Sequence, residues 1–143
     1  MTGINKRRVW IGALAAGVVW NIWSIVVNTV FLRPHYAVAQ EAGLLLKAPR
    51  YGSFLPIWII SLFVAAYVMT MLYASARATC GAGPKTALGI GLMVGFIAAF
   101  PGNFATATWS PMSRMLPLWW MLDIWVGAIL AALVAGFLYR DQG

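Results

Sequence analysis

The sequence predicts an all-α fold: a polytopic membrane protein whose four transmembrane helices form one antiparallel bundle. Of its 143 residues, 62% are hydrophobic and 9% are charged, whereas about a quarter of the residues of a soluble domain are charged. Four apolar segments approach the ~20 residues that a helix needs to cross the hydrocarbon core, and they do not alternate as barrel strands do. We therefore expect a single domain over residues 1–143, with spans at about 9–32, 55–74, 86–109 and 116–139.

Three basic residues precede the first span, residues 9–32, and a small-residue triplet at 37–39 follows it. This arrangement resembles a secretory signal with its cleavage site. The apolar core of a signal is about 7 to 15 residues long, which is much shorter than this span. We therefore expect a retained first helix.

One face of the first span is small and polar. Its members recur at steps of three or four residues, which places them on one side of a helix. They are Ala13, Gly17, Asn21, Ser24 and Asn28. We expect Gly17 to let another helix approach, and the polar members to form interhelical hydrogen bonds, which stabilise by about 0.6 kcal/mol on average in membranes.

The connection over residues 33–54 is long enough to have structure of its own. Arg33 and Pro34 open it, and residues 35–47 contain no helix breaker except Gly43. We expect residues 35–47 to form a short helix on the outer membrane surface.

The second span, residues 55–74, leads into a turn within residues 75–85. This turn contains Gly81 and Gly83, which permit a left-handed helix cap, and Pro84, which suits a first helical turn. The sequence predicts a tight hairpin between adjacent antiparallel helices.

Pro101 lies inside the third span, residues 86–109. Proline removes a backbone hydrogen bond, so we expect the helix to be kinked or broken at this residue. A break at membrane depth is typical of a backbone that lines a cavity, as in transporters. A simple kink is the favoured alternative, since proline is frequent in membrane helices.

Small residues recur at four-residue intervals in the last two spans. Gly91 and Gly95 form a GxxxG motif, and Gly127 and Ala131 repeat its spacing. Such positions allow two helix backbones to approach closely. We expect them to pack helices of this chain together, with a second protein as the alternative partner.

Asp123 is the only acidic side chain inside the four apolar segments, which makes it the best site candidate. An ionisable side chain within a membrane is a functional hypothesis by default. At a rise of ~1.5 Å per residue, Asn28, Asn103 and Asp123 all lie within about 10 Å of the outer helix ends. We predict a buried polar node of these three side chains, capped by Arg114, that either locks the bundle or binds an ion. The full candidate set is Asp123, Asn103, Asn28, Asn21, Ser24 and Arg114.

Trp119 and Trp120 precede Asp123 by four and three residues and so share its side of the helix. Together with Trp58 and Trp109 they also lie where an outer aromatic belt is expected. We assign them to this belt rather than to a ligand site.

The net charge of +7 indicates topology rather than nucleic-acid binding. The ten Lys and Arg residues are divided among termini and loops, so nucleic acid is not an expected partner. Under the positive-inside rule, both termini are expected in the cytoplasm. Six basic residues then lie inside (Lys6, Arg7, Arg8, Arg77, Lys85 and Arg140) and four outside (Arg33, Lys47, Arg50 and Arg114).

Residues that could support catalysis are scarce. His35 is the only histidine and Cys80 the only cysteine, so neither type can form a metal-binding cluster, and no intrachain disulfide is possible. Glu41 and Asp141 lie outside the spans, and no phosphate-binding loop, nucleophile elbow or zinc-helix motif occurs. We expect no catalytic activity, no metal and no cofactor.

The hairpin sequence resembles that of a family. LYASAR at residues 72–77, followed by GAGPKTAL at 81–88, is similar to the LYA..R...GPGPKTAL hairpin of an uncharacterised family of small four-helix bacterial inner-membrane proteins. The similarity extends to residues 17–21 and 118–123, and Ala82 stands where the family has proline. The resemblance implies the fold and an inner-membrane location, but no activity.

Two functional classes follow from these features. The first is a non-catalytic accessory or packing subunit of a membrane complex. The alternative is a small oligomeric transporter or channel, in which Asp123 binds a cation or proton near Pro101. The expected partners are the lipid bilayer and either another membrane protein or further copies of this chain.

Overall fold

The computed structural model describes residues 3–141, which form helices and no strand. The elements are α1 (Lys6–Val26), the π-helical turn η1 (Val27–Phe31), α2 (Arg33–Glu41), α3 (Phe54–Cys80), α4 (Pro84–Trp109) and α5 (Met115–Leu138). Four stretches are long and apolar enough to cross a membrane, namely α1 with η1, α3, α4 and α5. The predicted all-α, multi-pass fold is therefore confirmed.

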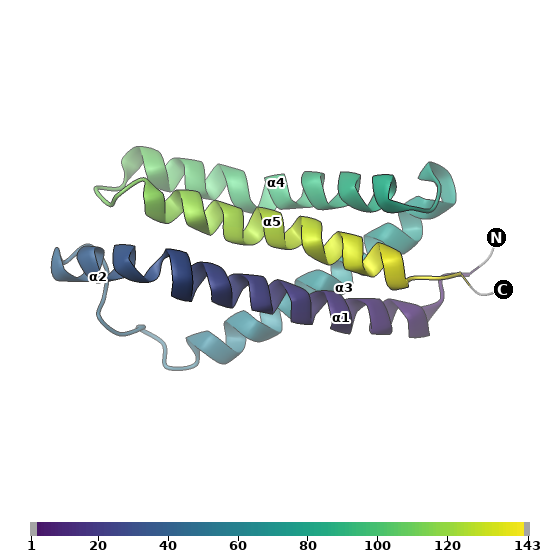
Figure 1. Ribbon diagram of the computed structural model, residues 1–143, viewed down its shortest axis with the longest axis horizontal. Helices are drawn as coiled ribbons and strands as arrows, with labels where there is room; N and C mark the ends of the chain where they lie inside the picture. Colours follow the sequence, from purple (N-terminus) through teal and green to yellow (C-terminus); the bar gives the residue numbers. More distant parts are fainter. Residues whose placement is uncertain (1–2, 142–143) are drawn as a thin grey trace.

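The four long helices alternate in direction, and α3 and α5 each contact all three of the others. Figure 1 shows α5 between α4 and α1, with α3 crossing behind them. α1 and α4 have no direct contact in the described part of the chain. The start of α1, the end of α5 and the α3–α4 turn lie together at one end, the terminal end (residues 5–8, 77–86 and 139–141). The opposite end, with α2 and residues 110–114, is the loop end.

Glycines of α4 hold this helix close to α5. A Cβ at Gly91 would lie 2.7 Å from the Cα of Ile129, so a larger residue would push the helices apart. Gly95 is similarly close to Trp125 of α5. The GxxxG motif therefore packs within this chain.

Two other glycines make room for aromatic rings. The indole of Trp20 in α1 lies over Gly127 of α5, and the ring of Phe63 in α3 lies over Gly17 of α1. A methyl group at either glycine would overlap the ring. Ala131, one turn after Gly127, is fully buried in the same core.

The turn between α3 and α4 is shorter than predicted. α3 continues to Cys80, beyond the expected end at residue 74, and α4 begins at Pro84. Gly81 and Gly83 have φ angles of 84° and 132°, which favour glycine and end the helix. α3 extends beyond the apolar run that ends at residue 74, because the glycine cap, and not hydropathy, determines where the helix ends.

The helix predicted over residues 35–47 is displaced. α2 begins at Arg33, because Pro34 fits its first turn, and ends before Gly43, which has a φ of 74°. α2 follows η1 directly, and its Ala39 packs with Leu32 and with Leu116 of α5. α2 is therefore fastened to the loop end of the bundle.

α4 runs through Pro101 without interruption, so the alternative of a helix broken at this residue is wrong. Proline removes the single hydrogen bond that its N–H would have made to the carbonyl of residue 97. The turns on both sides continue the helix, and the kink stays a prediction.

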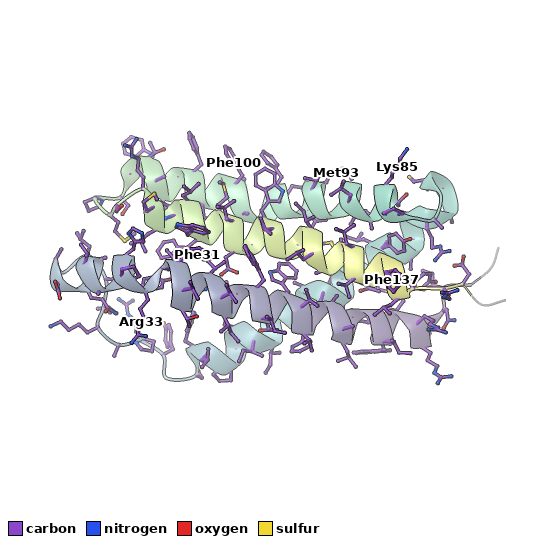
Figure 2. The ribbon with its side chains drawn as sticks, viewed as in Figure 1. Phe31, Arg33, Lys85, Met93, Phe100 and Phe137 are labelled. Carbon is purple, nitrogen blue, oxygen red and sulfur yellow. The ribbon has the colours of Figure 1, made fainter. Side chains whose placement is uncertain are left out.

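Large apolar side chains cover the outside of the bundle, as in membrane spans. Met93 of α4 and Phe137 of α5 are examples (Figure 2).

Candidate functional site

Asp123 of α5 is buried against α1, with 2% of its surface exposed. Its Oδ2 accepts hydrogen bonds from Ser24 Oγ and from Asn28 Nδ2, each at 3.0 Å. Ser24 lies in α1 and Asn28 one turn later in η1. The structure thus brings together three of the predicted node residues and joins α1 to α5 through them.

Three aromatic side chains add further hydrogen bonds: one to Ser24, one to Asn28 and one between two of the aromatic side chains themselves. Trp58 of α3 donates from Nε1 to Ser24 Oγ at 3.2 Å. The Tyr36 hydroxyl of α2 donates to Asn28 Oδ1 at 2.6 Å and accepts from Trp120 Nε1 at 2.7 Å. One hydrogen-bonded chain therefore connects α1, α2, α3 and α5. We call it the Asp123 network, which consists of Ser24, Asn28, Tyr36, Trp58, Trp120 and Asp123.

Tyr36 is placed to remain a donor in this network. Burial raises the pKa of its hydroxyl above the usual 10.0, and the nearby Asp123 raises it further, while the hydrogen bond from Trp120 opposes both. The hydroxyl therefore keeps its proton at neutral pH and can donate to Asn28.

Tyr36, Trp58 and Trp120 were not among the predicted site residues. The sequence signal for Trp120 is its position three residues before Asp123, which puts both on one face of the helix. Assigning Trp120 and Trp58 to an aromatic belt accounts for their depth only, whereas the structure also gives each indole N–H a hydrogen-bond acceptor. Tyr36 carried no such signal, because α2 reaches the network only through the fold.

Asn103 and Arg114 are not part of the Asp123 network, so the predicted node was wrong in these two members. Their hydrogen bonds and ion pairs within residues 3–141 do not reach Asp123; Asn103 Nδ2 instead donates to Ala99 O at 2.8 Å. The prediction was based on the depth of each side chain along its helix axis and took no account of the direction in which the side chain points around that axis. Asp123 faces α1, whereas Met121, two residues earlier and about 200° away around α5, faces α4.

Asn103 and Arg114 instead line a groove of about 430 Å³ between α4 and α5 on the outside of the bundle. We call it the α4–α5 groove. Its other lining residues are apolar: Phe100, Phe104 and Ala107 of α4, and Met115, Pro117, Leu118 and Met121 of α5.

Asn21 is also separate from the network. Its Nδ2 donates to Gly17 O at 2.9 Å within α1 and to Ile59 O of α3 at 3.5 Å. Asn21 therefore contributes to the α1–α3 contact, one turn away from Ser24.

Three buried polar atoms have no hydrogen-bond partner among the described residues. Two of them, Oδ1 of Asp123 and Nε1 of Trp20, lie between α1 and α5, and the third, Nε1 of Trp125, belongs to a ring beside α4. Trp20 lies one turn before Ser24 on α1 and packs on Gly127, one turn after Asp123 on α5. The Asp123 and Trp20 atoms thus belong to one α1–α5 interface, in which Asp123 could still receive a proton or a cation.

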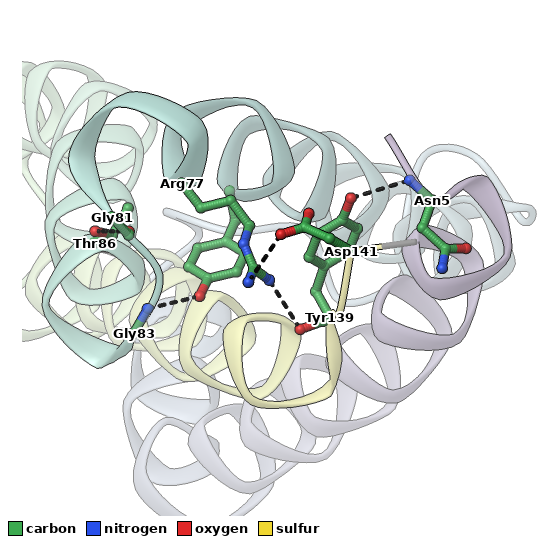
Figure 3. A network of polar contacts seen from close by, with 8 residues as sticks. Asn5, Arg77, Gly81, Gly83, Thr86, Tyr139 and Asp141 are labelled. Carbon is green, nitrogen blue, oxygen red and sulfur yellow. Dashed lines mark hydrogen bonds and ion pairs between the residues drawn. The ribbon is translucent and has the colours of Figure 1, made fainter. Parts of the chain in front are cut away.

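A second polar network lies at the terminal end (Figure 3). Arg77 of α3 donates from Nη1 to the carbonyl of Tyr139 at 3.1 Å, and its Nη2 lies 3.2 Å from Oδ2 of Asp141. The Tyr139 hydroxyl accepts from Asn5 N at 3.0 Å. The Asn5–Tyr139 bond thereby joins the chain before α1 to the chain after α5, and Arg77 joins α3 to the same segment, a role that its charge alone did not indicate.

Comparison with protein-family models, curated protein sequences and solved structures gives no match. The function of this chain is therefore inferred from its own residues. Within residues 3–141, no three His, Cys, Asp or Glu side chains lie close enough to hold a metal ion together. What the described part offers is a buried carboxylate, an outward, mainly apolar groove that contains Asn103 and Arg114, and a basic terminal end.

Proposed function

We propose that this chain is a non-catalytic accessory or packing subunit of a membrane complex, and that it binds a helix of its partner in the α4–α5 groove. The observation that supports this function is the position of Asn103 and Arg114. Both line a groove that none of the chain's own helices covers.

A polar side chain at membrane depth needs a partner. Asn103 lies six residues before the end of α4 at Trp109, about 9 Å below it at ~1.5 Å per residue. Its amide nitrogen bonds to Ala99 O, while its Oδ1 has no donor within residues 3–141. Intramembrane polar groups usually face protein or a water-filled cavity, and asparagine forms hydrogen bonds between membrane helices. A partner helix in the groove would supply the missing donor.

The proposal includes a location in a bacterial inner membrane, with the terminal end in the cytoplasm. Six basic residues lie at the terminal end and four at the loop end, which agrees with the positive-inside rule. The resemblance of the hairpin to a family of inner-membrane proteins points the same way.

The test is recovery of partners with the tagged protein after extraction in a mild detergent. We expect the unaltered chain to yield a defined complex, and Asn103→Leu to lose the partner while the bundle stays folded. Thr108→Val is the matched control, because Thr108 is exposed on the same helix, bonds only to Phe104 O and does not line the groove. Recovery of the unaltered chain as a bare monomer would remove the proposal.

A second candidate, proton or cation transport by an oligomer, is favoured by one observation. Oδ1 of Asp123 is buried and has no hydrogen-bond partner within residues 3–141, which leaves the carboxylate able to take a proton or an ion. Asp123→Asn separates the two functions in liposome flux assays. A packing role predicts a less stable protein with little change in flux, whereas transport predicts lost flux in a folded protein.

A further inference from the structure

A groove of about 520 Å³ opens at the terminal end between α3, α5 and the α3–α4 turn. We call it the terminal groove. Two arginines and two tyrosines lie around it, and one wall is an apolar strip of α5. The lining residues are Tyr73, Arg77, Ala82, Gly83, Pro84, Leu133, Gly136, Phe137, Tyr139 and Arg140.

Arg77 is held in position at this groove. Its guanidinium lies over the rings of Tyr139 and Tyr73, at 5.1 Å and 5.9 Å from their centres, and donates to the Tyr139 carbonyl. Tyr73 is itself fixed, because its hydroxyl accepts from Gly83 N at 3.0 Å. The cation is therefore oriented before any ligand arrives, which reduces the entropy lost on binding.

The structure already places an oxyanion against this cation. Oδ2 of Asp141 lies 3.2 Å from Arg77 Nη2 (Figure 3). The Asp141 side chain is 44% exposed, so a stronger anion can displace it. Arg140, which is exposed and also lines the groove, adds a second cation beside the same position.

The wall below these charges is apolar. Leu133, Gly136 and Phe137 follow α5 toward the membrane interior, and Phe137 is 82% exposed. A ligand that fills the groove therefore needs an anionic head and a hydrocarbon chain on one molecule. Basic pockets between membrane helices on the cytoplasmic side bind phospholipid head groups in this way.

We propose that the terminal groove binds an anionic phospholipid, whose phosphate contacts Arg77 and Arg140 and whose acyl chain lies along Leu133 and Phe137. This site is independent of the proposed partner function, because the α4–α5 groove lies between the end of α4 and the start of α5, at the opposite end of α5 from the terminal groove. Bound lipid would join the end of α3 to the end of α5.

The experiment is native mass spectrometry of the purified protein titrated with phosphatidylglycerol or with phosphatidylcholine of the same chain length. We expect phosphatidylglycerol to bind preferentially. Arg140→Gln should weaken its binding about fivefold, the effect of one basic residue near a lipid surface. Asp141→Asn should strengthen it, because a competing carboxylate is lost.

Arg50→Gln is the matched control, since it removes the same charge at an exposed position of the loop end that lines neither groove; we expect it to leave lipid binding unchanged. Equal losses in Arg140→Gln and Arg50→Gln, or equal binding of the two lipids, would overturn the proposal. So would displacement of the lipid by an equal concentration of inorganic phosphate, because the acyl chain would then contribute nothing. Asp141→Asn keeps the test decisive if Arg140→Gln does not fold.

Discussion

At the scale of single residues, the Asp123 network accounts for most of the polar side chains that the first span carries toward α5. Ser24 donates to Asp123, Tyr36 donates to Asn28, and the amide nitrogen of Asn28 donates both to Asp123 and to the carbonyl of Ser24. Removing one member takes a hydrogen bond from a buried or half-buried partner, which costs more where that partner is left without another bond.

We predict that Asn28→Ala destabilises the bundle by about 1–2 kcal/mol, the upper range for interhelical hydrogen bonds in membranes. The substitution removes the bonds to Asp123 and to Tyr36 together. Thermal unfolding in detergent measures the effect. Thr29→Ala is the control, because Thr29 is exposed and bonds only to Ile25 O; equal losses in both variants would contradict the prediction.

Titration of Tyr36 should make the stability of the folded protein depend on pH in the alkaline range. Burial, the largest effect, raises the pKa of the folded Tyr36 above the unfolded value near 10.0. Its contribution to stability is fully present below that unfolded pKa, and is lost as the pH rises toward the folded pKa, because only the unfolded chain then releases the proton. We expect the unfolding temperature to fall in this range, and to fall less in Tyr36→Phe. Parallel curves for the two proteins would show that Tyr36 does not contribute.

At the scale of elements, hydropathy predicts the four spans because a bilayer requires long apolar runs. It does not predict where the helices end, since Gly43 and Gly81 stop α2 and α3 through backbone conformation. Depth along a helix also follows from the sequence, which is why Asn28 and Asp123 could be grouped, and helical spacing is why Ser24 could be placed on the same face as Asn28. The rotation of each helix depends on packing with its neighbours, and for this reason the position of Asn103 could not be predicted.

Close helix contact can be tested at one glycine. We predict that Gly127→Ala destabilises the protein by about 1–3 kcal/mol, as expected of an overpacked core, because the added methyl overlaps the Trp20 ring. Gly89→Ala is the control: it lies in α4 with no atom within 4 Å of its Cβ position, and alanine favours the helix. Unfolding by denaturant in mixed micelles compares the two, and an unaffected Gly127→Ala would contradict the tight contact.

At the scale of the whole molecule, the membrane orientation inferred from the charge asymmetry can be tested with Cys80, the single cysteine of the chain. It is exposed at the end of α3, at the terminal end. If this end is cytoplasmic, a membrane-impermeant maleimide should label Cys80 in inverted vesicles but not in intact cells with a permeable outer envelope.

A cysteine at the opposite end of the bundle is the control for this topology experiment. Ala48→Cys in a Cys80→Ser background places the thiol in the exposed connection between α2 and α3, at the loop end. It should react in intact cells. Labelling of Cys80 from outside would reverse the proposed orientation, together with the cytoplasmic placement of the terminal groove.

The contact of α5 with all three other long helices has a consequence for biosynthesis. During translation α1, α3 and α4 leave the ribosome before α5, and α1 and α4 have no contact with each other. Until α5 enters the bilayer, the hydroxyl of Ser24 and the amide of Asn28 lack the carboxylate that they bond to, and Gly91 lacks the backbone that it packs against. Insertion of α5 is therefore the step that completes the buried polar contacts and the glycine packing of a bundle in which α3 already contacts both α1 and α4.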